Sequence, residues 1–427
     1  AGVEKKFGDI HRLSLVTFAA PGQRGAQNAS TQEVYDMMGD NMYNSNWGYQ
    51  NGRVRNARVR KTFEPITILK YTATPTDNLE ASATLLWRTG KNGYTAMDWY
   101  DAADPRPDYY RNLPSYFWME DENYDRANEQ KYYWALDAWT QGYPEYTHLN
   151  WDRLYNVNYN SIDAEGLRRS KYVLEERRVD QNDLNFGANV KWNTTKWFTL
   201  TGGINYKWNR TEYYKKLDDL LGGDYYVNID QFAERDFAST PVMVQNDLDY
   251  YFAHGNQAQV LHKGDKYGYD YYANIRKAEL WANGAFDLGN FKANVALQAG
   301  YEKFWRNGLV RKGLFPGLNE DGSELVIEGK TLTTYEKVGN ELVPISSKGK
   351  SAVADFFTYS AKLGLQYHFE GGHRIYANGG YFNDAPTFAQ SFISPRTRNS
   401  LVPNLETMKT LSTDINYQYS NNGYNVR

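Results

Sequence analysis

The clearest pattern in the chain is a pair of alternating runs between Leu184 and Trp208, with the sequence LNFGANVKWNTTKWFTLTGGINYKW. Apolar side chains occupy every second position on both sides of the polar stretch Asn193–Lys196. Alternation of this kind gives a β-strand one apolar and one polar face. The sequence therefore predicts a long β-hairpin. A strand of a soluble β-sandwich alternates in the same way, so the hairpin alone leaves the fold class open.

Similar alternation recurs along the chain, mostly in pairs of runs joined by short turns. The predicted strands outside the first hairpin are His11–Ala20, Phe63–Thr74, Leu79–Arg88, Ala278–Asp287, Phe291–Phe304, Phe357–Phe369, Arg374–Tyr381 and Leu411–Tyr419. Long polar and aromatic stretches without periodicity separate them, at residues 23–60, 89–170, 209–277, 305–355 and 383–409. Short and long connections between the predicted strands therefore alternate along the chain.

Two of the long stretches carry local signals of their own. Glu122–Trp139 has the composition of one short helix. The stretch 305–355 contains Asp321–Gly322 and Gly339–Asn340, dipeptides that favour tight turns, so we expect a small hairpin standing off the main body there.

The alternation of short and long connections is typical of outer-membrane barrels, which have short periplasmic turns on one rim and long extracellular loops on the other. A closed barrel also satisfies every backbone hydrogen-bonding group in lipid. The predicted fold class is therefore an all-β, transmembrane antiparallel β-barrel. In such a barrel the turn Asn193–Lys196 lies at the periplasmic rim. The side chains expected to face lipid are Phe198, Leu200 and Ile204, and those expected to line the lumen are Asn189, Lys191, Thr201 and Asn205.

The composition narrows the class further. Aromatic residues make up 16% of the 427, and the mean hydropathy is -0.75. No run approaches the roughly 18 apolar residues of a transmembrane helix, but alternating strands escape a hydropathy window. The formal net charge of -3 gives no basic surplus, so no nucleic-acid partner is expected. The absence of Cys excludes disulfides and thiolate metal sites.

Several loop motifs carry a family resemblance. They are Phe18–Gly25 (FAAPGQRG), Tyr43–Tyr49 (YNSNWGY), Trp87–Tyr94 (WRTGKNGY), Asp98–Tyr116 (DWYDAADPRPDYYRNLPSY) and Ser394–Asn399 (SPRTRN). With these motifs the chain resembles the barrel of a TonB-dependent outer-membrane receptor. The subgroup that it resembles usually begins with a carboxypeptidase-regulatory-like domain ahead of its plug.

The resemblance implies a 22-stranded barrel occluded by an N-terminal plug, with uptake driven by the inner-membrane TonB complex. It also implies contact with outer-membrane lipid and lipopolysaccharide, and it allows for a surface lipoprotein partner. The sequence contains no plug, no TonB-interacting segment and no signal peptide before Ala1, and no closing strand after Arg427. We therefore expect residues 1–427 to be the central part of a single barrel, with an unpaired strand edge on each side.

The strongest ligand-binding candidates are aromatic residues of the longest loop. They are Trp99, Tyr100, Tyr109, Tyr110, Tyr116 and Trp118. Aromatic rings beside Asp and Arg can stack on a flat or glycosidic ligand while the charges orient it. The alternative interpretation is that these rings pack the long loops against each other. The cargo stays open among small molecules, peptides and glycans.

Metal and cofactor chemistry has weaker support. The acidic groups Asp218–Asp224 and Asp180–Asp183 offer oxygen donors for calcium, but neither has EF-hand spacing, and solvated loop acids explain them as well. The six histidines show no paired-ligand spacing for haem, and His368 and His373 flank a short turn that we place at the periplasmic rim. We predict no metal site and no cofactor.

Catalysis is not predicted either. Glu175 and Glu176 are neighbours on a predicted strand, so they point to opposite faces and cannot form an acid/base pair. No phosphate-binding glycine loop, zinc-binding helix motif or nucleophile elbow occurs. Charged side chains expected in the lumen, where they could contact a plug or simply form a polar interior, are Lys191, Lys207, Glu279, Lys292, Glu302 and Lys362.

These observations predict a TonB-dependent transporter in the bacterial outer membrane, which captures a scarce nutrient with its extracellular loops and is not an enzyme. Two rival functions fit parts of the pattern. The first is a secreted soluble β-rich protein that binds glycans through exposed aromatics. The second is a passive outer-membrane porin.

Overall fold

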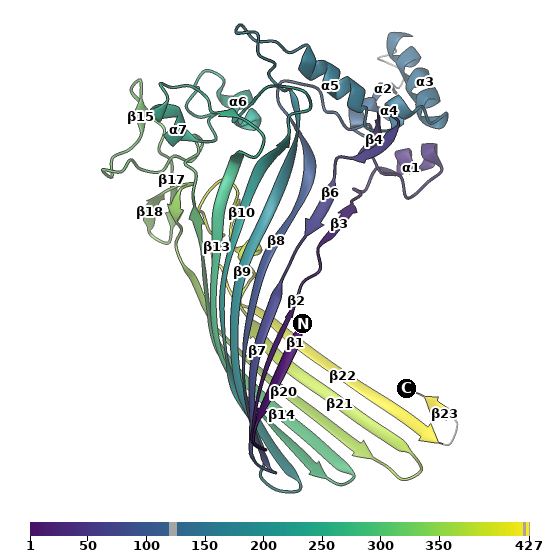
Figure 1. The fold of residues 1–427 in the computed structure, drawn as a ribbon, viewed down its shortest axis with the longest axis vertical. Helices are drawn as coiled ribbons and strands as arrows, with labels where there is room; N and C mark the ends of the chain where they lie inside the picture. Colours follow the sequence, from purple (N-terminus) through teal and green to yellow (C-terminus); the bar gives the residue numbers. More distant parts are fainter. Residues whose placement is uncertain (119–125, 422–423, 427) are drawn as a thin grey trace.

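The computed structural model describes residues 1–118, 126–421 and 424–426. One large antiparallel sheet dominates it, and each strand of its main path pairs with the next strand of that path along the chain (Figure 1). The strands of this path are β1 (Gly2–Phe7), β2 (His11–Phe18), β7 (Ile66–Thr76), β8 (Leu79–Trp99), β9 (Tyr172–Asn193), β10 (Phe198–Asp219), β13 (Lys266–Leu288), β14 (Phe291–Gly308), β20 (Ala354–His368), β21 (His373–Asp384), β22 (Met408–Asn421) and β23 (Tyr424–Val426).

All short connections lie at one end of this sheet and all long excursions at the other. The turns gather at the bottom of Figure 1, whereas the helices and small strands gather at the top. The predicted sorting of connections is therefore confirmed, and we call the two ends the turn side and the loop side. His368 and His373, which end β20 and begin β21, lie on the turn side as predicted.

The predicted hairpin is confirmed, and the structure gives its register. Leu200 lies opposite Trp192 and Trp208 opposite Leu184, with an unbroken ladder between these pairs. The predicted strand ends are wrong, because β9 begins at Tyr172 and β10 continues to Asp219. The expected aperiodic stretches 89–170 and 209–277 are likewise entered by β8, β10 and β13.

The strands were underestimated because their loop-side halves are buried on both faces. Tyr172 and Leu174 pack with Trp151 on one face of β9. Val173 packs with Leu217 on the other face. A strand that is buried on both faces has no alternation of apolar and polar residues. The pattern that identifies the turn-side halves is therefore missing in the loop-side halves.

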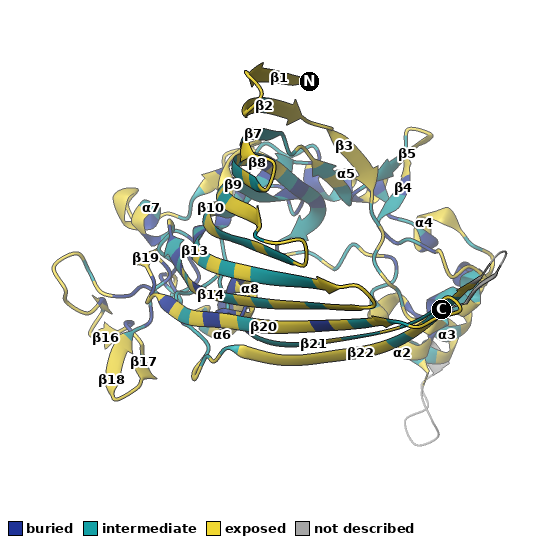
Figure 2. Cartoon of the chain, turned by 90° about the horizontal axis from the view of Figure 1, so that it is seen from below, coloured by how far each residue is buried: buried dark blue, intermediate teal, exposed yellow. Residues whose placement is uncertain are grey.

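Seen from below, the sheet is an open, curved arc rather than a closed cylinder (Figure 2). In the described part of the chain, β1 pairs only with β2 and β23 only with β22. The fold is that of part of a transmembrane-type β-barrel. None of the described helices is long and apolar enough to cross a membrane.

The turn-side halves have one apolar and one polar face, as predicted. Cross-strand pairs such as Ile204–Leu280 and Val295–Leu363 build a continuous apolar surface on one side. Its side chains are solvent-exposed, for example Leu280 at 63% and Leu363 at 47%. Exposed apolar surface on this scale marks an interaction with another apolar phase.

The opposite, polar face carries the charges expected for the lumen. Lys277 Nζ lies 2.8 Å from Glu279 and 3.7 Å from Glu302. Lys292 lies 2.7 Å from Asp287. These pairs confirm that Glu279 and Glu302 share one face, and we call this the inner face and the apolar one the outer face.

The excursions contain more structure than predicted. Their helices are α1 (Gln32–Met38), η1 (Tyr110–Asn112), α2 (Pro114–Phe117), α3 (Arg126–Thr140), α4 (Pro144–Thr147), α5 (Trp151–Tyr159), α6 (Gln231–Phe237), α7 (Leu248–Ala253) and α8 (Phe388–Ser391). Their strands are β3 (Gly22–Gly25), β4 (Trp47–Gln50), β5 (Arg53–Asn56), β6 (Val59–Thr62), β11 (Tyr226–Val227), β12 (Val260–Leu261), β15 (Val326–Ile327), β16 (Lys330–Thr331), β17 (Tyr335–Val338), β18 (Glu341–Pro344) and β19 (Gly349–Lys350).

Two local predictions in the excursions hold and one does not. The β17–β18 hairpin turns at Gly339–Asn340, as expected. The predicted helix corresponds to α3, and residues 122–125 of that prediction lie outside the described part. The stretch 23–60, expected to be a loop, contains α1 and four short strands, because some of its apolar residues, Val34 and Tyr43 among them, are buried. Tyr43, for example, is 4% exposed and packs edge-on against Trp139 at 5.7 Å between ring centroids.

Candidate ligand site at the loop side of the sheet

A polar cavity of about 240 Å³ opens at the loop side, where four excursions meet the inner face. Strand alternation places its wall on that face: Arg177 shares its side of β9 with Lys191, and Lys215 shares its side of β10 with Lys207. The cavity is lined by Asp98, Trp99, Tyr100, Arg177, Lys215, Tyr226, Ile229, Asp230, Gln231, Phe232, Asn246, Tyr267, Gly268, Tyr269, Lys312, Arg396 and Thr397.

A buried ion cluster forms the strand side of the cavity. Lys215 Nζ lies 2.8 Å from Asp98 Oδ2 and 3.0 Å from Glu175 Oε2. The Tyr267 hydroxyl donates to the same two carboxylates at 2.9 and 3.2 Å. Arg177 completes the cluster through Glu175. One lysine therefore joins carboxylates from two neighbouring strands, which fixes the mouth of the sheet.

A transmembrane strand needs about 9–11 residues, whereas β9 and β10 have 22 each, so this cluster stands beyond the membrane-spanning segments. Burial alone would raise the pKa of Asp98, but the Lys215 ammonium outweighs it and holds that pKa below its usual value. Burial also opposes the charge of Lys215, and the two carboxylates more than compensate, so the pKa of Lys215 is raised. Asp98 and Lys215 are therefore both charged at neutral pH.

Two further cations line the cavity from the excursions and have no ion pair among the described residues. Lys312 is only 7% exposed, and its ammonium donates to Asn246 Oδ1 at 2.6 Å. Burial lowers the pKa of Lys312 to about 8. Arg396 is exposed and lies over the Tyr269 ring at 5.2 Å. Asp230 also lines the cavity and forms no ion pair among the described residues. The four cations of the lining, Arg177, Lys215, Lys312 and Arg396, still outnumber its two carboxylates, Asp98 and Asp230.

Arg306 fixes the segment that presents Arg396. Its guanidinium is buried, and it donates to the backbone carbonyls of Pro395 and Ser347 at 2.7 Å each and to the side chain of Asn399. Burial lowers the pKa of Arg306 to about 10. The motif Ser394–Asn399, singled out in the sequence, therefore has a definite place as one rim of the cavity.

The six predicted aromatic residues separate into two groups. Trp99 and Tyr100 line the cavity. Tyr100 is 9% exposed, and its hydroxyl donates to Glu234 Oε1 at 2.6 Å, in a setting where burial raises its pKa to about 12. Arg169 lies over the Tyr100 ring at 4.8 Å. Tyr100 is therefore held in place by its neighbours, as the packing interpretation expects.

The other four aromatic residues lie on the excursion around α2, away from the cavity lining. Tyr109 and Tyr110 meet at 4.7 Å between ring centroids, Tyr110 and Tyr116 at 5.5 Å, and Trp118 contacts Tyr132 at 5.1 Å. Tyr110, Tyr116 and Trp118 are about half exposed, at 52%, 48% and 57%. The rings thus pack against each other yet keep free surface, and a role in binding stays a prediction.

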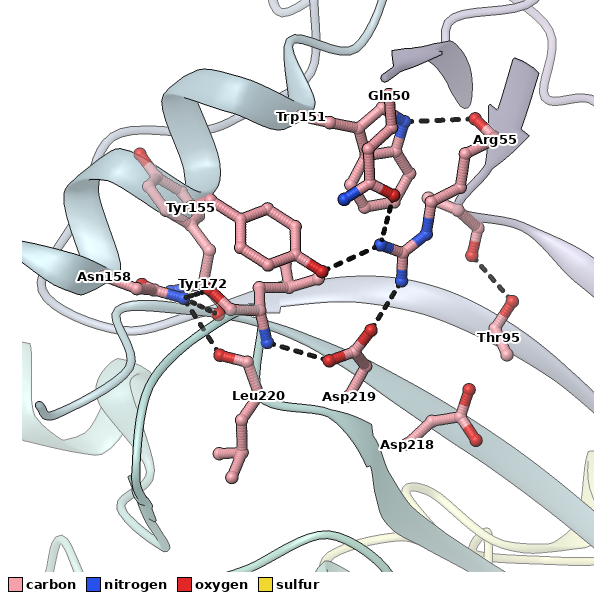
Figure 3. A network of polar contacts seen from close by, with 12 residues as sticks. Gln50, Arg55, Thr95, Trp151, Tyr155, Asn158, Tyr172, Asp218, Asp219 and Leu220 are labelled. Atoms are coloured by element: carbon pink, nitrogen blue, oxygen red, sulfur yellow. Dashed lines mark hydrogen bonds and ion pairs between the residues drawn. The ribbon is translucent and has the colours of Figure 1, made fainter. Parts of the chain in front are cut away.

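The excursions that carry these residues form a packed platform rather than free loops. Arg55 on β5 donates to Gln50, to the Tyr155 hydroxyl of α5 and to Asp219 at the end of β10 (Figure 3). Asn158 of α5 donates to the carbonyl of Leu220 at 3.0 Å. Three distant parts of the chain are therefore held together on the face of β9 opposite the ion cluster.

The acidic groups considered for calcium are mostly engaged with cations. Asp219 pairs with Arg55 at 2.6 Å and Asp224 with Arg168 at 2.9 Å. Asp183 pairs with Arg88. No group of three potential metal ligands occurs within the described ranges. Glu175 and Glu176 point to opposite faces, as predicted, because Glu175 joins the cavity cluster and Glu176 binds Lys216 at 3.0 Å and Arg178 at 3.0 Å.

Sequence reasoning missed most of the cavity. Lys215 and Tyr267 fell in a stretch taken as a loop, and Lys312 stands alone in another. Arg177 is an even number of positions from Lys191, and Lys215 an even number from Lys207. Longer predicted strands would therefore have placed both side chains on the lumen face. No sequence pattern predicts that Lys312 lies in this cavity, because its position there depends on how its excursion folds.

The chain matches no family model and no curated protein sequence. Among solved structures, the open form of the ferric-catecholate import receptor Fiu from E. coli K12 aligns at 10% identity with a TM-score of 0.48, covering 98% of this chain and 48% of that one. The copper transporter OprC aligns at 8% identity with a TM-score of 0.48, covering 99% and 42%. The ferric citrate transporter FecA aligns at 8% identity with a TM-score of 0.47, covering 96% and 38%. This chain therefore spans less than half the length of each.

Proposed function

We propose that the chain is the central part of an outer-membrane barrel that imports a scarce nutrient actively, powered by the TonB complex through a plug. The observation that carries this proposal is the charged cavity on the inner face at the loop side of a sheet whose outer face is apolar. A ligand held there lies at the entrance to the lumen. Release of a plug then opens the way past the inner-face charges.

The excursions suit the capture step. The half-exposed rings of Tyr110, Tyr116 and Trp118 offer stacking surface at the outside, and the cavity with Trp99 and Tyr100 offers a deeper polar site. The platform around Arg55 supports the cavity wall at Trp99, which packs against the same cluster as Trp151. A surface lipoprotein that closes over these excursions would complete the capture, which is the partner we propose on the extracellular side.

The ligand class follows from the charges of the cavity. Lys312 and Arg396 lack ion pairs in the described structure, and the burial of Lys312 makes an unpaired ammonium costly there. A ligand with a carboxylate or phosphate group would supply the missing counter-charge and accept hydrogen bonds from both side chains. We therefore propose an anionic cargo rather than a neutral glycan or a free cation.

Transport is tested in the producing bacterium with a deletion strain and its complemented parent. Depletion of nutrients from the medium is followed by mass spectrometry with and without a protonophore. Active uptake predicts that one solute is depleted only by the complemented strain and only when the membrane is energised. Depletion that survives the protonophore identifies a passive porin, and recovery of the protein from the soluble fraction identifies the secreted binder.

The ligand class is tested separately, on the purified protein. Small molecules retained by the wild type and by Lys312→Met are compared by mass spectrometry in negative-ion mode. We expect an anionic compound that is retained by the wild type and depleted in the variant. If both proteins retain only neutral compounds, and in equal amounts, the proposal of an anionic cargo is contradicted. The result of the uptake experiment is not affected by this outcome.

A further inference from the structure

Two rows of aromatic side chains bound the apolar band on the outer face. The row toward the turns is formed by Phe198, Phe286, Phe291 and Tyr367, and the row toward the loops by Tyr206, Tyr301, Phe357 and Tyr359. Along β14 ten positions separate Phe291 from Tyr301. At 3.3 Å per residue and a tilt near 45°, they span about 23 Å of height. An outer-membrane barrel has an apolar band of about 25 Å between its aromatic girdles, so the two rows mark the two headgroup levels.

A row of basic residues follows directly on the loop side of the upper aromatic row. Trp208, Arg276 and Lys303 lie opposite one another on three adjacent strands. The Arg276 guanidinium sits over the rings of Trp208 at 4.8 Å and Trp305 at 5.3 Å. Arg210 and Lys350 extend the row, and each also lies over an aromatic ring, at 3.8 and 5.3 Å. We call Arg210, Arg276, Lys303 and Lys350 the basic belt.

The basic belt has more positive charge than the acids beside it can pair. One acid, Asp355 on β20, lies opposite Lys303, and its carboxylate accepts a hydrogen bond from the Tyr301 hydroxyl at 2.6 Å. None of its four members has an ion pair among the residues that the structure describes. The acids nearest in the same strands, Glu212 and Asp270, both bind Lys266 instead. A groove of about 350 Å³ opens beside the belt, lined by Tyr206, Arg276, Lys277, Ala278, Tyr301, Lys303 and Trp305.

We propose that the basic belt binds the phosphate groups of lipid A in the outer leaflet. Lipid is the occupant that the geometry favours, because the belt continues the lipid-facing surface upward and stands at the height of the headgroups. Guanidinium and ammonium groups are the usual protein partners of phosphate. The neighbouring aromatic rings are of the kind that lies at the level of the lipid headgroups. The proposal depends on the sheet spanning the outer membrane and is independent of what is transported.

The test uses the full protein extracted from its own outer membrane. Lipid A that co-purifies with the wild type is quantified by mass spectrometry and compared with that of the double variant Arg276→Gln/Lys303→Gln. The matched control is Lys191→Gln/Lys207→Gln, which removes two cations from the inner face of β9 and β10. A conservative variant, Arg276→Lys/Lys303→Arg, keeps both charges. Migration with and without heating shows whether each barrel is folded.

We expect the outer-face double variant to retain about tenfold less lipid A, in line with the attraction between each basic residue and an anionic leaflet. The control and the conservative variant should retain as much as the wild type. Thermal stabilisation by added lipid A should disappear in the double variant, and dephosphorylated lipid A should stabilise neither protein. Equal lipid retention by the double variant and the inner-face control, or equal stabilisation by the dephosphorylated lipid, would overturn the proposal.

Discussion

The turn-side and loop-side halves of the same strands differ in burial and in what stabilises them. In β9 the turn-side residues 184–193 alternate between an apolar and a polar face, and most of them are exposed. The loop-side residues Tyr172–Glu176 are all buried, because α5 covers one face and the cavity cluster the other. The turn-side halves therefore depend on a lipid environment for stability, whereas the loop-side halves depend on contacts within the protein.

Breaking the ion cluster of the loop side should give the largest effect. Lys215→Met leaves the buried Asp98 carboxylate without its ammonium partner, which costs about 3–5 kcal/mol, whereas Glu175 keeps Arg177. We expect the excursion between β8 and β9 to lose protection in hydrogen exchange while the turn-side halves stay protected. Lys216→Met, one residue further along, is the control, because Glu176 keeps Arg178 and Lys61. Equal effects of the two variants would contradict the distinction between the faces.

A charge on the outer face of the turn side should act through the membrane instead. Leu363→Arg places a guanidinium in the apolar band and should cost about 2–4 kcal/mol near the bilayer midplane, which blocks assembly. Ser360→Arg carries the same side chain on the inner face of β20 and should assemble. Heat-modifiable migration of the extracted barrels measures both. Normal assembly of Leu363→Arg would show that this face does not meet lipid.

The pH dependence of ligand retention tests the cavity on the loop side. Burial lowers the pKa of Lys312 to about 8, so its ammonium is present below that pH and is lost above it. Retention of an anionic ligand should therefore be strongest below pH 8 and should fall up to tenfold per pH unit above it. Equilibrium binding between pH 6 and 10 measures the profile. In Lys312→Arg the decline in ligand retention should move to higher pH. If the decline occurs at the same pH as in the wild type, a group other than Lys312 causes it.

The same contrast explains what the sequence could and could not predict. Leu200 and Ile204 alternate with polar neighbours, so the strand, its faces and its turn followed from the pattern. Val173 and Leu174 are buried on opposite faces, so no alternation marks that half. The site was found only where it lies in an aromatic motif, at Trp99 and Tyr100. Lys215 and Lys312 are 97 positions apart, and both line the cavity only because the excursion between β14 and β20 folds over the wall to which Lys215 belongs.

The exposed aromatic residues of the platform should give the smallest effect. If Trp118 contributes stacking surface to ligand capture, Trp118→Ala should weaken binding by about 0.5–1.5 kcal/mol, which is roughly a two- to twelvefold change in affinity. Trp134→Ala is the matched control, since this ring is equally exposed, at 54%, and also packs on a tyrosine. Titration of the retained ligand into both variants separates the two interpretations. Equal affinity of both variants and the wild type would leave these rings with a packing role alone, and the cavity would then be the only capture site that the proposal needs.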